Sequence, residues 1–271
     1  MAESLKIGVV GASGRMGRMV VSIIAGSNDC ELAGATEAPG SEFLGADAGA
    51  LAGVGDNGVI VTDDTGAMFS GVDVVIDFTI PAATQAHAQI AAEADCALVA
   101  GTTGMEDIHR GALEVAAASV PIVWAPNMSA GVNLLFAVTQ QVARALGEDF
   151  DIEIVEMHHR HKIDAPSGTA LGLGEAAAAG RGVDFDAVKQ LSREGITGER
   201  KPGDIGFATL RGGDVVGEHS VVFAGAGERI ELSHRATDRA IFARGAVRAA
   251  LWTAGKPAGF YSMNDVLGLA D

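Results

Sequence analysis

Cysteine, aromatic residues and positive charge are all scarce in this sequence. It contains two Cys, 5% aromatic residues and a formal net charge of −16 at pH 7. Cys30 and Cys96 are too few for a disulfide framework, so we expect buried thiols in a reducing, cytoplasmic environment. A large negative charge repels phosphates, which argues against nucleic acids and anionic membranes as partners.

Long hydrophobic runs are also missing. No uninterrupted apolar stretch reaches membrane-spanning length, and Glu3 directly precedes the first apolar segment, so we expect no transmembrane helix and no signal peptide. What the chain does have is 271 residues, 48% of them hydrophobic, and 37 Gly. These values predict a globular α/β protein with one large or two ordinary domains.

The first 130 residues alternate between strand and helix patterns. Strands are predicted over residues 5–10, 31–36, 59–62, 73–79, 96–100 and 121–124. Such alternation predicts a Rossmann-type, doubly wound parallel sheet, here in a dinucleotide-binding domain spanning residues 1–130. We expect the C-terminal segment 238–271, which begins with a helix, to complete this domain.

The first strand ends in a glycine turn, Gly11-Ala12-Ser13-Gly14-Arg15-Met16-Gly17. Gly11 permits a tight turn, Gly14 lets the backbone approach a pyrophosphate, and Gly17 lets the following helix pack closely. Glu37, at the end of the second strand, is correctly spaced to accept hydrogen bonds from ribose hydroxyls. The spacing G-x-x-G-x-x-G departs from the usual G-x-G-x-x-G, so a glycine turn without a ligand remains the alternative.

Ligands of doubly wound sheets bind beyond the carboxyl ends of the strands. Four strand ends therefore predict one dinucleotide site. Its expected contacts are Gly11, Ala12, Ser13, Gly14, Arg15, Met16, Glu37, Gly101, Thr102, Thr103, Ala125, Pro126, Asn127 and Met128.

From residue 131 to 237 the pattern changes, which predicts a second, α+β domain with an open mixed sheet for substrate binding and oligomerisation. Its strands are expected over residues 151–155, 206–210, 215–223 and 229–234. Gly212-Gly213-Asp214 and Gly225-Ala226-Gly227 predict tight turns that join antiparallel hairpins. We expect Val221-Val222-Phe223 on an open apolar face that another subunit covers.

Three of the seven His gather in one segment, Glu156-Met157-His158-His159-Arg160-His161-Lys162-Ile163-Asp164-Ala165-Pro166-Ser167-Gly168-Thr169-Ala170. It joins a strand to a helix for which Ser167 is the expected N-cap. Helix N-termini bind anions, so this segment predicts a pocket for an acidic small molecule. A solvated surface loop is the alternative without function.

A metal site is the other reading of clustered histidines. In an extended chain His158 and His159 point to opposite sides, and Arg160 and Lys162 repel a cation. We therefore expect no metal. The same geometry requires the segment to curl if His158 and His159 are to reach one ligand, and crowding by cations favours neutral imidazoles in the empty pocket.

The glycine turn, the segments Gly101-Thr102-Thr103-Gly104 and Asn127-Met128-Ser129, the His-rich segment and the tail from Tyr261 to Leu267 together resemble the 4-hydroxy-tetrahydrodipicolinate reductase family. Their order matches that family from end to end, and the His-rich motif is highly specific. The resemblance implies reduction of a cyclic dicarboxylic imine by NADH or NADPH in diaminopimelate and lysine synthesis. It also implies a homotetramer assembled through second-domain sheets.

Residue roles follow from the resemblance. It implies that His158 stabilises or protonates the reacting ring system and that Lys162 donates a proton. It places His159, Gly168 and Thr169 at the substrate carboxylates, where we also expect Ser167 at the helix start. Cations and acids near the ring stabilise the charge that develops when hydride arrives.

One departure from the family concerns the residue after Glu37. Many members place an Arg there, which can hold the 2′-phosphate of NADPH, whereas this chain has Ala38. Glu37 also repels that phosphate, so we predict a preference for NADH, tempered by the charges of Arg15 and Arg18.

Two other classes remain possible on the sequence alone. A regulatory protein that binds a dinucleotide without chemistry would share the glycine turn and Glu37, but would not need Lys162 beside three His. An aspartate-semialdehyde or homoserine type of dehydrogenase would share the two-domain plan. The aspartate-semialdehyde type needs a nucleophilic cysteine, and Cys30 and Cys96 are poorly placed for that role.

Overall fold

The polypeptide is divided into two structural units in the computed structural model, which describes residues 4–269. The first unit contains the chain up to Ala130 and again from Ala240 onward. The second runs from Gly131 to Arg239. Within the described residues no helix is long and apolar enough to cross a membrane.

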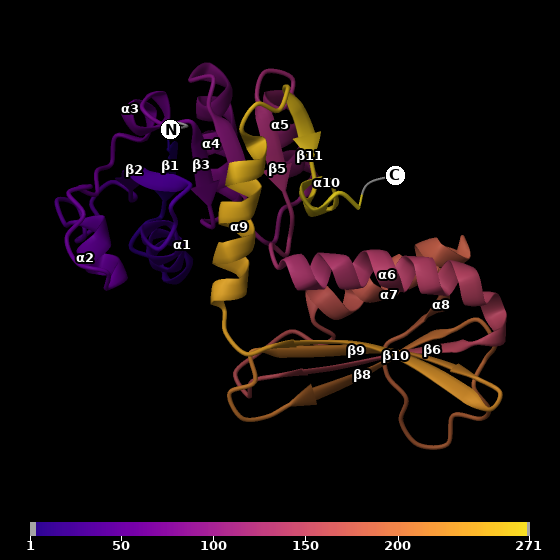
Figure 1. The fold of residues 1–271 in the computed structure, drawn as a ribbon. Coiled ribbons are helices and arrows are strands. Elements are labelled where there is room, and N and C mark those ends of the chain that lie inside the picture. Colours follow the sequence, from indigo (N-terminus) through magenta and orange to yellow (C-terminus); the bar gives the residue numbers. More distant parts are fainter. Residues whose placement is uncertain (1–3, 270–271) are drawn as a thin grey trace. The chain divides into compact units, whose positions relative to one another are not determined.

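Parallel strands form the sheet of the first unit, in the order β11-β5-β4-β3-β1-β2 (Figure 1). Their bounds are β1 (Leu5–Val10), β2 (Cys30–Thr36), β3 (Val74–Asp77), β4 (Ala97–Ala100), β5 (Pro121–Trp124) and β11 (Gly259–Tyr261). The predicted doubly wound parallel sheet is confirmed, and the chain's last strand joins it beside β5. The predicted strand over residues 59–62 is wrong, because Ile60 and Thr62 form only isolated bridges.

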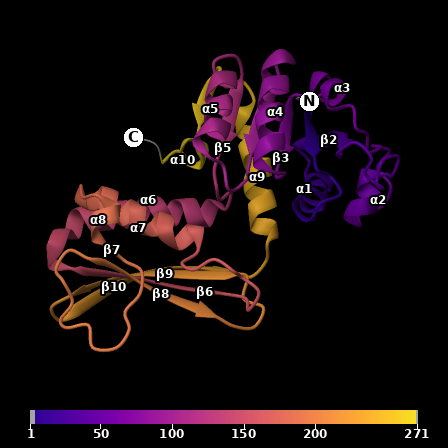
Figure 2. The same ribbon diagram turned by 180° about the vertical axis from the view of Figure 1, so that it is seen from behind.

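Helices cover both faces of this sheet. One face packs against α1 (Arg15–Ala25), α2 (Ala48–Ala52), α9 (Ala240–Thr253) and α10 (Met263–Leu267). The other packs against α3 (Thr65–Ser70), α4 (Pro81–Glu93) and α5 (Asp107–Ala116). Figure 1 shows α9 in front of the sheet. In the opposite view, Figure 2, α4 and α5 lie in front of the sheet. Burial on both faces explains why β3 and β4 are almost entirely apolar.

The second unit contains a mixed sheet in the order β10-β9-β6-β8-β7. Its strands are β6 (Asp151–His158), β7 (Lys189–Gln190), β8 (Ile205–Arg211), β9 (Gly217–Gly225) and β10 (Glu228–Ala236). The β9–β10 hairpin is confirmed. The predicted hairpin between β8 and β9 is wrong, because β6 lies between them, parallel to β8 and antiparallel to β9.

The turn at residues 212–214 therefore passes around the end of β6 instead of closing a hairpin. Gly212 N donates to His158 O at 2.9 Å, and Arg160 N donates to Gly213 O at 3.2 Å. These bonds fasten the start of the His-rich segment to the connection between β8 and β9. As a result, both neighbours of β6 bring side chains to its carboxyl end.

One face of the mixed sheet is covered by α6 (Ala130–Leu146) and α7 (Gly168–Arg181), with α8 (Phe185–Val188) following in the chain (Figure 1). Alternate residues of β6, including Ile152 and Ile154, are fully buried beneath these helices. Val221 and Phe223 lie on the same buried face, so the prediction that they are exposed is wrong. Only Val222 of that triplet lies on the face that the helices leave open.

Candidate functional site

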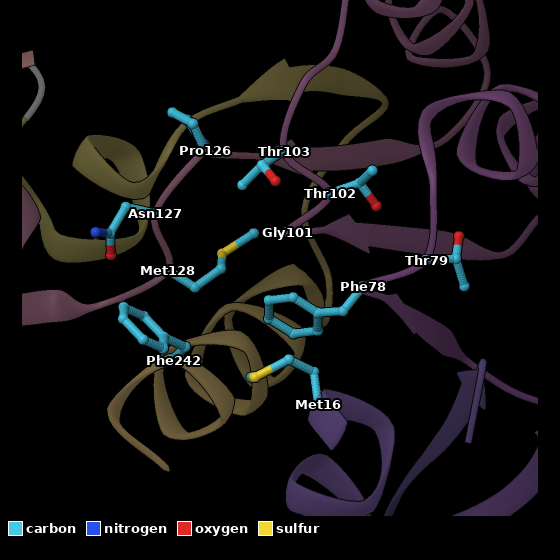
Figure 3. Close-up of a pocket in the computed structure, with 10 residues that line it drawn as sticks. All are labelled: Met16, Phe78, Thr79, Gly101, Thr102, Thr103, Pro126, Asn127, Met128 and Phe242. Carbon is cyan, nitrogen blue, oxygen red and sulfur yellow. The ribbon is translucent and has the colours of Figure 1, made fainter. Parts of the chain in front are cut away.

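A pocket of about 270 Å³ lies among strand ends of the first unit (Figure 3). Its lining is Met16, Phe78, Thr79, Gly101, Thr102, Thr103, Pro126, Asn127, Met128 and Phe242. Figure 3 shows Thr102 and Thr103 across the pocket from Met16 and Phe242, with Met128 and Phe78 between them. Flat apolar walls with a few polar groups suit an aromatic amide such as nicotinamide.

Seven predicted cofactor residues line this pocket: Met16, Gly101, Thr102, Thr103, Pro126, Asn127 and Met128. Ala12 and Ala125 are not part of this lining and are buried, at 2% and 4% exposure. Phe78, Thr79 and Phe242 were missed. The end of β3 could have been included by the same rule as the other strand ends, whereas Phe242 comes from α9, which nothing in the sequence places there.

The glycine turn has the backbone expected of a dinucleotide loop. Gly11 has φ +64°, and Gly14 is the N-cap of α1. A Cβ at Gly17 would lie 2.2 Å from Gly11 O, so only glycine lets the helix approach the turn this closely. The roles predicted for Gly11 and Gly17 follow directly from this geometry.

Glu37 reaches back from the end of β2 to the glycine turn. Its Oε1 accepts from Ser13 N at 2.8 Å and from Ser13 Oγ at 2.6 Å. Arg18 does not approach this carboxylate as a partner; its Nε donates to Ser13 O at 2.7 Å, and its guanidinium stacks over Phe43. Glu37 and Ser13 therefore form one polar edge of the turn.

A buried carboxylate, Asp77, supports the pocket from the end of β3. It accepts from Thr79 N at 2.7 Å, from Thr79 Oγ1 at 2.6 Å and from His87 Nδ1 at 2.8 Å. Burial opposes ionisation, but the bonds from His87 and Thr79 outweigh it and lower the pKa of Asp77. Thr102 Oγ1 donates to Asp77 Oδ1 at 3.4 Å and lies 2.7 Å from Thr84 Oγ1, so the pocket residues Thr79 and Thr102 are both held by this network.

In the second unit, the His-rich segment begins inside a strand. β6 runs to His158, three residues beyond the predicted end at Val155, so His158 has a fixed direction on the helix-covered face. The chain then turns: Lys162 N donates to His159 O at 3.1 Å. The predicted curl of the segment is confirmed.

Glu156 joins several groups at the carboxyl end of β6. Its side chain is 1% exposed. Oε2 accepts from His158 Nδ1 at 2.6 Å and from Arg211 Nη1 at 2.8 Å. Oε1 accepts from Ser167 N and from Arg211 Nη2, both at 3.0 Å. One carboxylate thus contacts a predicted catalytic residue, a cation from β8 and the N-cap of α7.

His219, on β9, completes this buried cluster. Its Nε2 lies 3.1 Å from Ser167 Oγ, and its ring meets the His158 ring edge-on with centroids 5.0 Å apart. Burial, followed by the charge of His158, lowers the pKa of His219 to about 4, so it is neutral at pH 7. Arg211 and His219 were missed by the sequence analysis, because only the sheet register shows that they flank β6.

His158 is also held neutral, but the main cause differs from the one expected. Burial makes the largest contribution to lowering the pKa of His158, and the charges of Lys162 and Arg211 add to it. The hydrogen bond and charge of Glu156 oppose this effect without overcoming it. Glu156 itself is ionised, because bonds from Arg211 and His158 outweigh its burial and lower its pKa.

The exposed part of the segment carries further positive charge. Lys162 Nζ pairs with Asp164 Oδ1 at 2.8 Å, and His159 Nε2 lies 3.3 Å from Arg239 Nη2. Ser167 caps α7 by accepting from Ala170 N at 3.1 Å, as predicted. Gly168 is exposed, and a Cβ there would meet no atom within 4 Å, so the first turn of α7 borders open space.

Alternative chemistries have less support in the structure. Among the described residues no cluster of three His, Cys, Asp or Glu side chains is placed to hold a metal ion. Both cysteines are buried. Burial and the charges of Asp73 and Asp95 raise the pKa of Cys96 to about 12, which is the opposite of what a nucleophilic thiol requires.

The glycine turn on a doubly wound sheet, with a separate α+β unit bearing a cluster of histidine, arginine and lysine side chains, is typical of the class of two-domain nucleotide-dependent dehydrogenases and reductases. Solved structures agree on the fold. An amine dehydrogenase from Mycobacterium smegmatis has a TM-score of 0.62 at 12% identity, covering 97% of this chain and 96% of its own. A dipicolinate-bound dihydrodipicolinate reductase from a Paenisporosarcina species has a TM-score of 0.75 at 23% identity, with 96% and 98% covered.

The chain belongs to the dihydrodipicolinate reductase family. Residues 5–128 match the family's N-terminal region and residues 131–267 its C-terminal region. A 4-hydroxy-tetrahydrodipicolinate reductase from a Ruegeria species is 57% identical over 269 residues, covering 99% of this chain and all of that protein. Another from Cereibacter sphaeroides is 58% identical with the same coverage. The resemblance drawn from the motifs is confirmed.

Proposed function

We propose that this protein reduces 4-hydroxy-tetrahydrodipicolinate to tetrahydrodipicolinate with NADH or NADPH, in the cytoplasmic synthesis of diaminopimelate and lysine. The single observation that carries the proposal is identity of 57% over the whole chain to a reductase of that name. Two features support it: the pocket at the strand ends of the first unit suits a nicotinamide, and the cations of the His-rich segment suit a dicarboxylate. The bound nicotinamide supplies a hydride, and the substrate's hydroxyl group leaves as water.

The residues of the first unit fit a nicotinamide dinucleotide. The glycine turn leaves room for a pyrophosphate at the N-terminus of α1, and the pocket between Met16 and Phe242 has the size and polarity for a nicotinamide. We assign Gly11 to Met16, Glu37, Gly101 to Thr103 and Ala125 to Met128 to cofactor binding.

The residues of the second unit suit a doubly negative ring. We assign the carboxylates to the start of α7, at Ser167, Gly168 and Thr169, with His159 beside them. A bound dianion favours the protonated form of His158, because it offsets the surrounding positive charge. His158 then stabilises charge on the ring, and Lys162 donates the proton that balances the incoming hydride.

Lys162 has an alternative partner in Asp164, which lies 2.8 Å away. A substrate carboxylate competes with Asp164 for this ammonium. Because Asp164 is more than half exposed, water can solvate it once Lys162 moves, so the exchange has a small free-energy cost.

The function is tested by a coupled assay. Purified protein receives pyruvate, aspartate semialdehyde and the upstream synthase, and the loss of NADH absorbance is followed. Oxidation of NADH that depends on all three, and that pyridine-2,6-dicarboxylate inhibits, supports the proposal. A rate no greater than that without the protein would refute it.

Cofactor preference is a finer proposal. Glu37 is ionisable and lies at the ribose edge of the turn, Ala38 offers no cation, and Arg18 is engaged with Ser13 and Phe43. We therefore predict that kcat/KM is higher with NADH than with NADPH, and that Ala38→Arg narrows the difference. Steady-state kinetics with both cofactors measures this, and a wild-type enzyme that uses NADPH more efficiently contradicts it.

A further inference from the structure

Glu156 is the most highly connected buried charge in the second unit that the proposed reaction leaves without a role. It is ionised and 1% exposed, and each of its oxygens accepts two hydrogen bonds. Arg211 binds it in a bidentate fashion and neutralises it. A carboxylate that served only to pair with Arg211 would not also need bonds to His158 and to Ser167.

The contact with His158 determines which ring nitrogen carries the proton. An ionised carboxylate can only accept, so His158 Nδ1, 2.6 Å from Oε2, must be the donor. In the neutral ring the proton is then on Nδ1, and Nε2 has a lone pair. Gly217 avoids crowding this nitrogen, since a Cβ at that position would lie 3.0 Å from Nε2.

The contact with Ser167 fixes the start of α7 to the same carboxylate. Ser167 N donates to Oε1, and Ser167 Oγ caps the helix through Ala170 N. His158 and the start of α7 are consequently both bonded to the Glu156 carboxylate, which fixes their positions relative to each other. That arrangement sets the basic nitrogen of His158 relative to the proposed carboxylate site.

We propose that Glu156 is a positioning residue that holds His158 in its Nδ1–H tautomer, so that Nε2 is the atom that takes up a proton when the dianion binds and stabilises the charge on the substrate ring. This proposal rests on the proposed reductase function and deepens it. Glu156 acts through His158, as the carboxylate of a catalytic triad acts through its histidine.

The substitution Glu156→Gln tests this tautomer. At the Oε1 position a side-chain NH2 would face donors from Ser167 and Arg211, neither of which can reverse its role. At the Oε2 position it would face Arg211 and His158, and His158 can adapt by moving its proton to Nε2. The variant should therefore favour the wrong tautomer while it keeps the size of the side chain.

The matched control is Glu153→Gln. Glu153 lies on the same strand as Glu156 but on the opposite face. Like Glu156 it is bonded to arginine, in its case to Arg193 and Arg200. Its loss removes a comparable charge and comparable hydrogen bonds without touching His158. Because Glu153 lies on the helix-free face of the sheet, light scattering first checks that E153Q keeps the particle mass of the wild type. Effects confined to the Glu156 variant therefore report on the cluster, not on the loss of a carboxylate from β6.

The experiment measures ¹⁵N shifts by solid-state NMR on protein labelled in histidine, with His158→Asn to assign the signal. In the wild type at pH 7.5, His158 should be protonated on Nδ1 and unprotonated on Nε2. In E156Q the proton should move to Nε2. In E153Q the spectrum should match that of the wild type. In the coupled assay, E156Q should lose at least about tenfold in kcat with a change in KM of less than about threefold.

Wild-type His158 protonated on Nε2, or E156Q with unchanged tautomer and kcat, would overturn the proposal. If E156Q does not fold, the wild-type tautomer still decides. A correct tautomer in a protein without reductase activity would count against the proposed function alone, whereas full activity with the wrong tautomer would count against the positioning role alone.

Discussion

At the scale of single residues, the cluster in the second unit contains two kinds of ionisable group: those proposed to exchange protons with the substrate, and those whose protonation state stays the same. Glu156 and Arg211 neutralise each other in the interior, and His219 stays neutral because it is buried. His158 is bonded to Glu156, and Lys162 lies in the same segment and pairs with the exposed Asp164. The proposed chemistry is thus left to His158 and Lys162, which are not locked into the pair between Glu156 and Arg211.

His158→Ala and Lys162→Ala should each reduce kcat by about 100-fold or more, since each removes a positioned proton donor or acceptor. The measurement is steady-state turnover with saturating cofactor. Arg160→Ala is the control, because Arg160 is an exposed cation in the same segment and has no proposed role. Near-normal turnover in both substituted enzymes would contradict the assignment.

His219 should make the folded state sensitive to acid. The pKa of His219 is lowered from 6.5 to about 4, so the unfolded chain binds its proton at a higher pH than the folded protein does. Its contribution is therefore complete above pH 6.5 and is lost as the pH falls toward about 4, by on the order of 3 kcal/mol.

The test compares urea unfolding of the wild type and of His219→Gln across this pH range. The wild type should lose more stability than the variant as the pH falls, because the variant cannot take up this proton on unfolding. Parallel pH dependences in the two proteins would show that His219 is not the group responsible.

At the scale of elements, functional groups sit where one element ends against another. The pocket of the first unit needs the start of α1 and the ends of β3, β4 and β5, and it also needs α9, a helix from the far end of the chain. A Cβ at Gly245 in α9 would lie only 1.7 Å from Met128 O. The helix and the loop after β5 are therefore in direct backbone contact.

Gly245→Ala should displace the loop at Met128 and weaken NADH binding by about tenfold or more, because overpacking of this kind costs about 1–3 kcal/mol. The dissociation constant for NADH is measured by fluorescence titration. The control is Gly111→Ala in α5, where a Cβ meets nothing within 4 Å. Gly111→Ala should raise the free energy of unfolding by about 0.5–1 kcal/mol without changing NADH affinity. Equal NADH affinities in the wild type, Gly245→Ala and Gly111→Ala would contradict the prediction.

At the scale of the whole molecule, the second unit leaves one face of its mixed sheet without helices. Val222 and Leu210 lie on that face, among the charged side chains of Glu153 and its arginine partners. We propose, as the family resemblance implies, that the protein is a homotetramer assembled through these sheets.

Val222→Arg should reduce the mass of the particle, because it places a new charge in the centre of the proposed interface. Multi-angle light scattering measures the mass at micromolar concentration. Val115→Arg is the control, since Val115 is an apolar residue on α5 with 76% exposure. A monomeric wild type would contradict the tetramer, and a tetrameric Val222 variant would place the interface elsewhere.

The sequence was most informative where a structural feature depends on residues that are close together in the chain. Alternating apolar runs predicted the strands of the parallel sheet, and the capping role of Ser167 was read from its place before an Ala- and Leu-rich run. The glycine turn could be interpreted because its constraint, a tight backbone approach, lies within a few residues. Local signals failed at residues 59–62, where pairing partners were too few to form a strand.

By itself, then, the sequence determined the doubly wound sheet, the glycine turn, the curl of the His-rich segment and the family. Only the tertiary structure decided that β6 lies between β8 and β9, and that Arg211, His219 and Glu156 consequently enclose His158. Strand order and register depend on contacts between residues more than fifty positions apart, so the motif that carries His158 could not reveal the neighbours that control its proton.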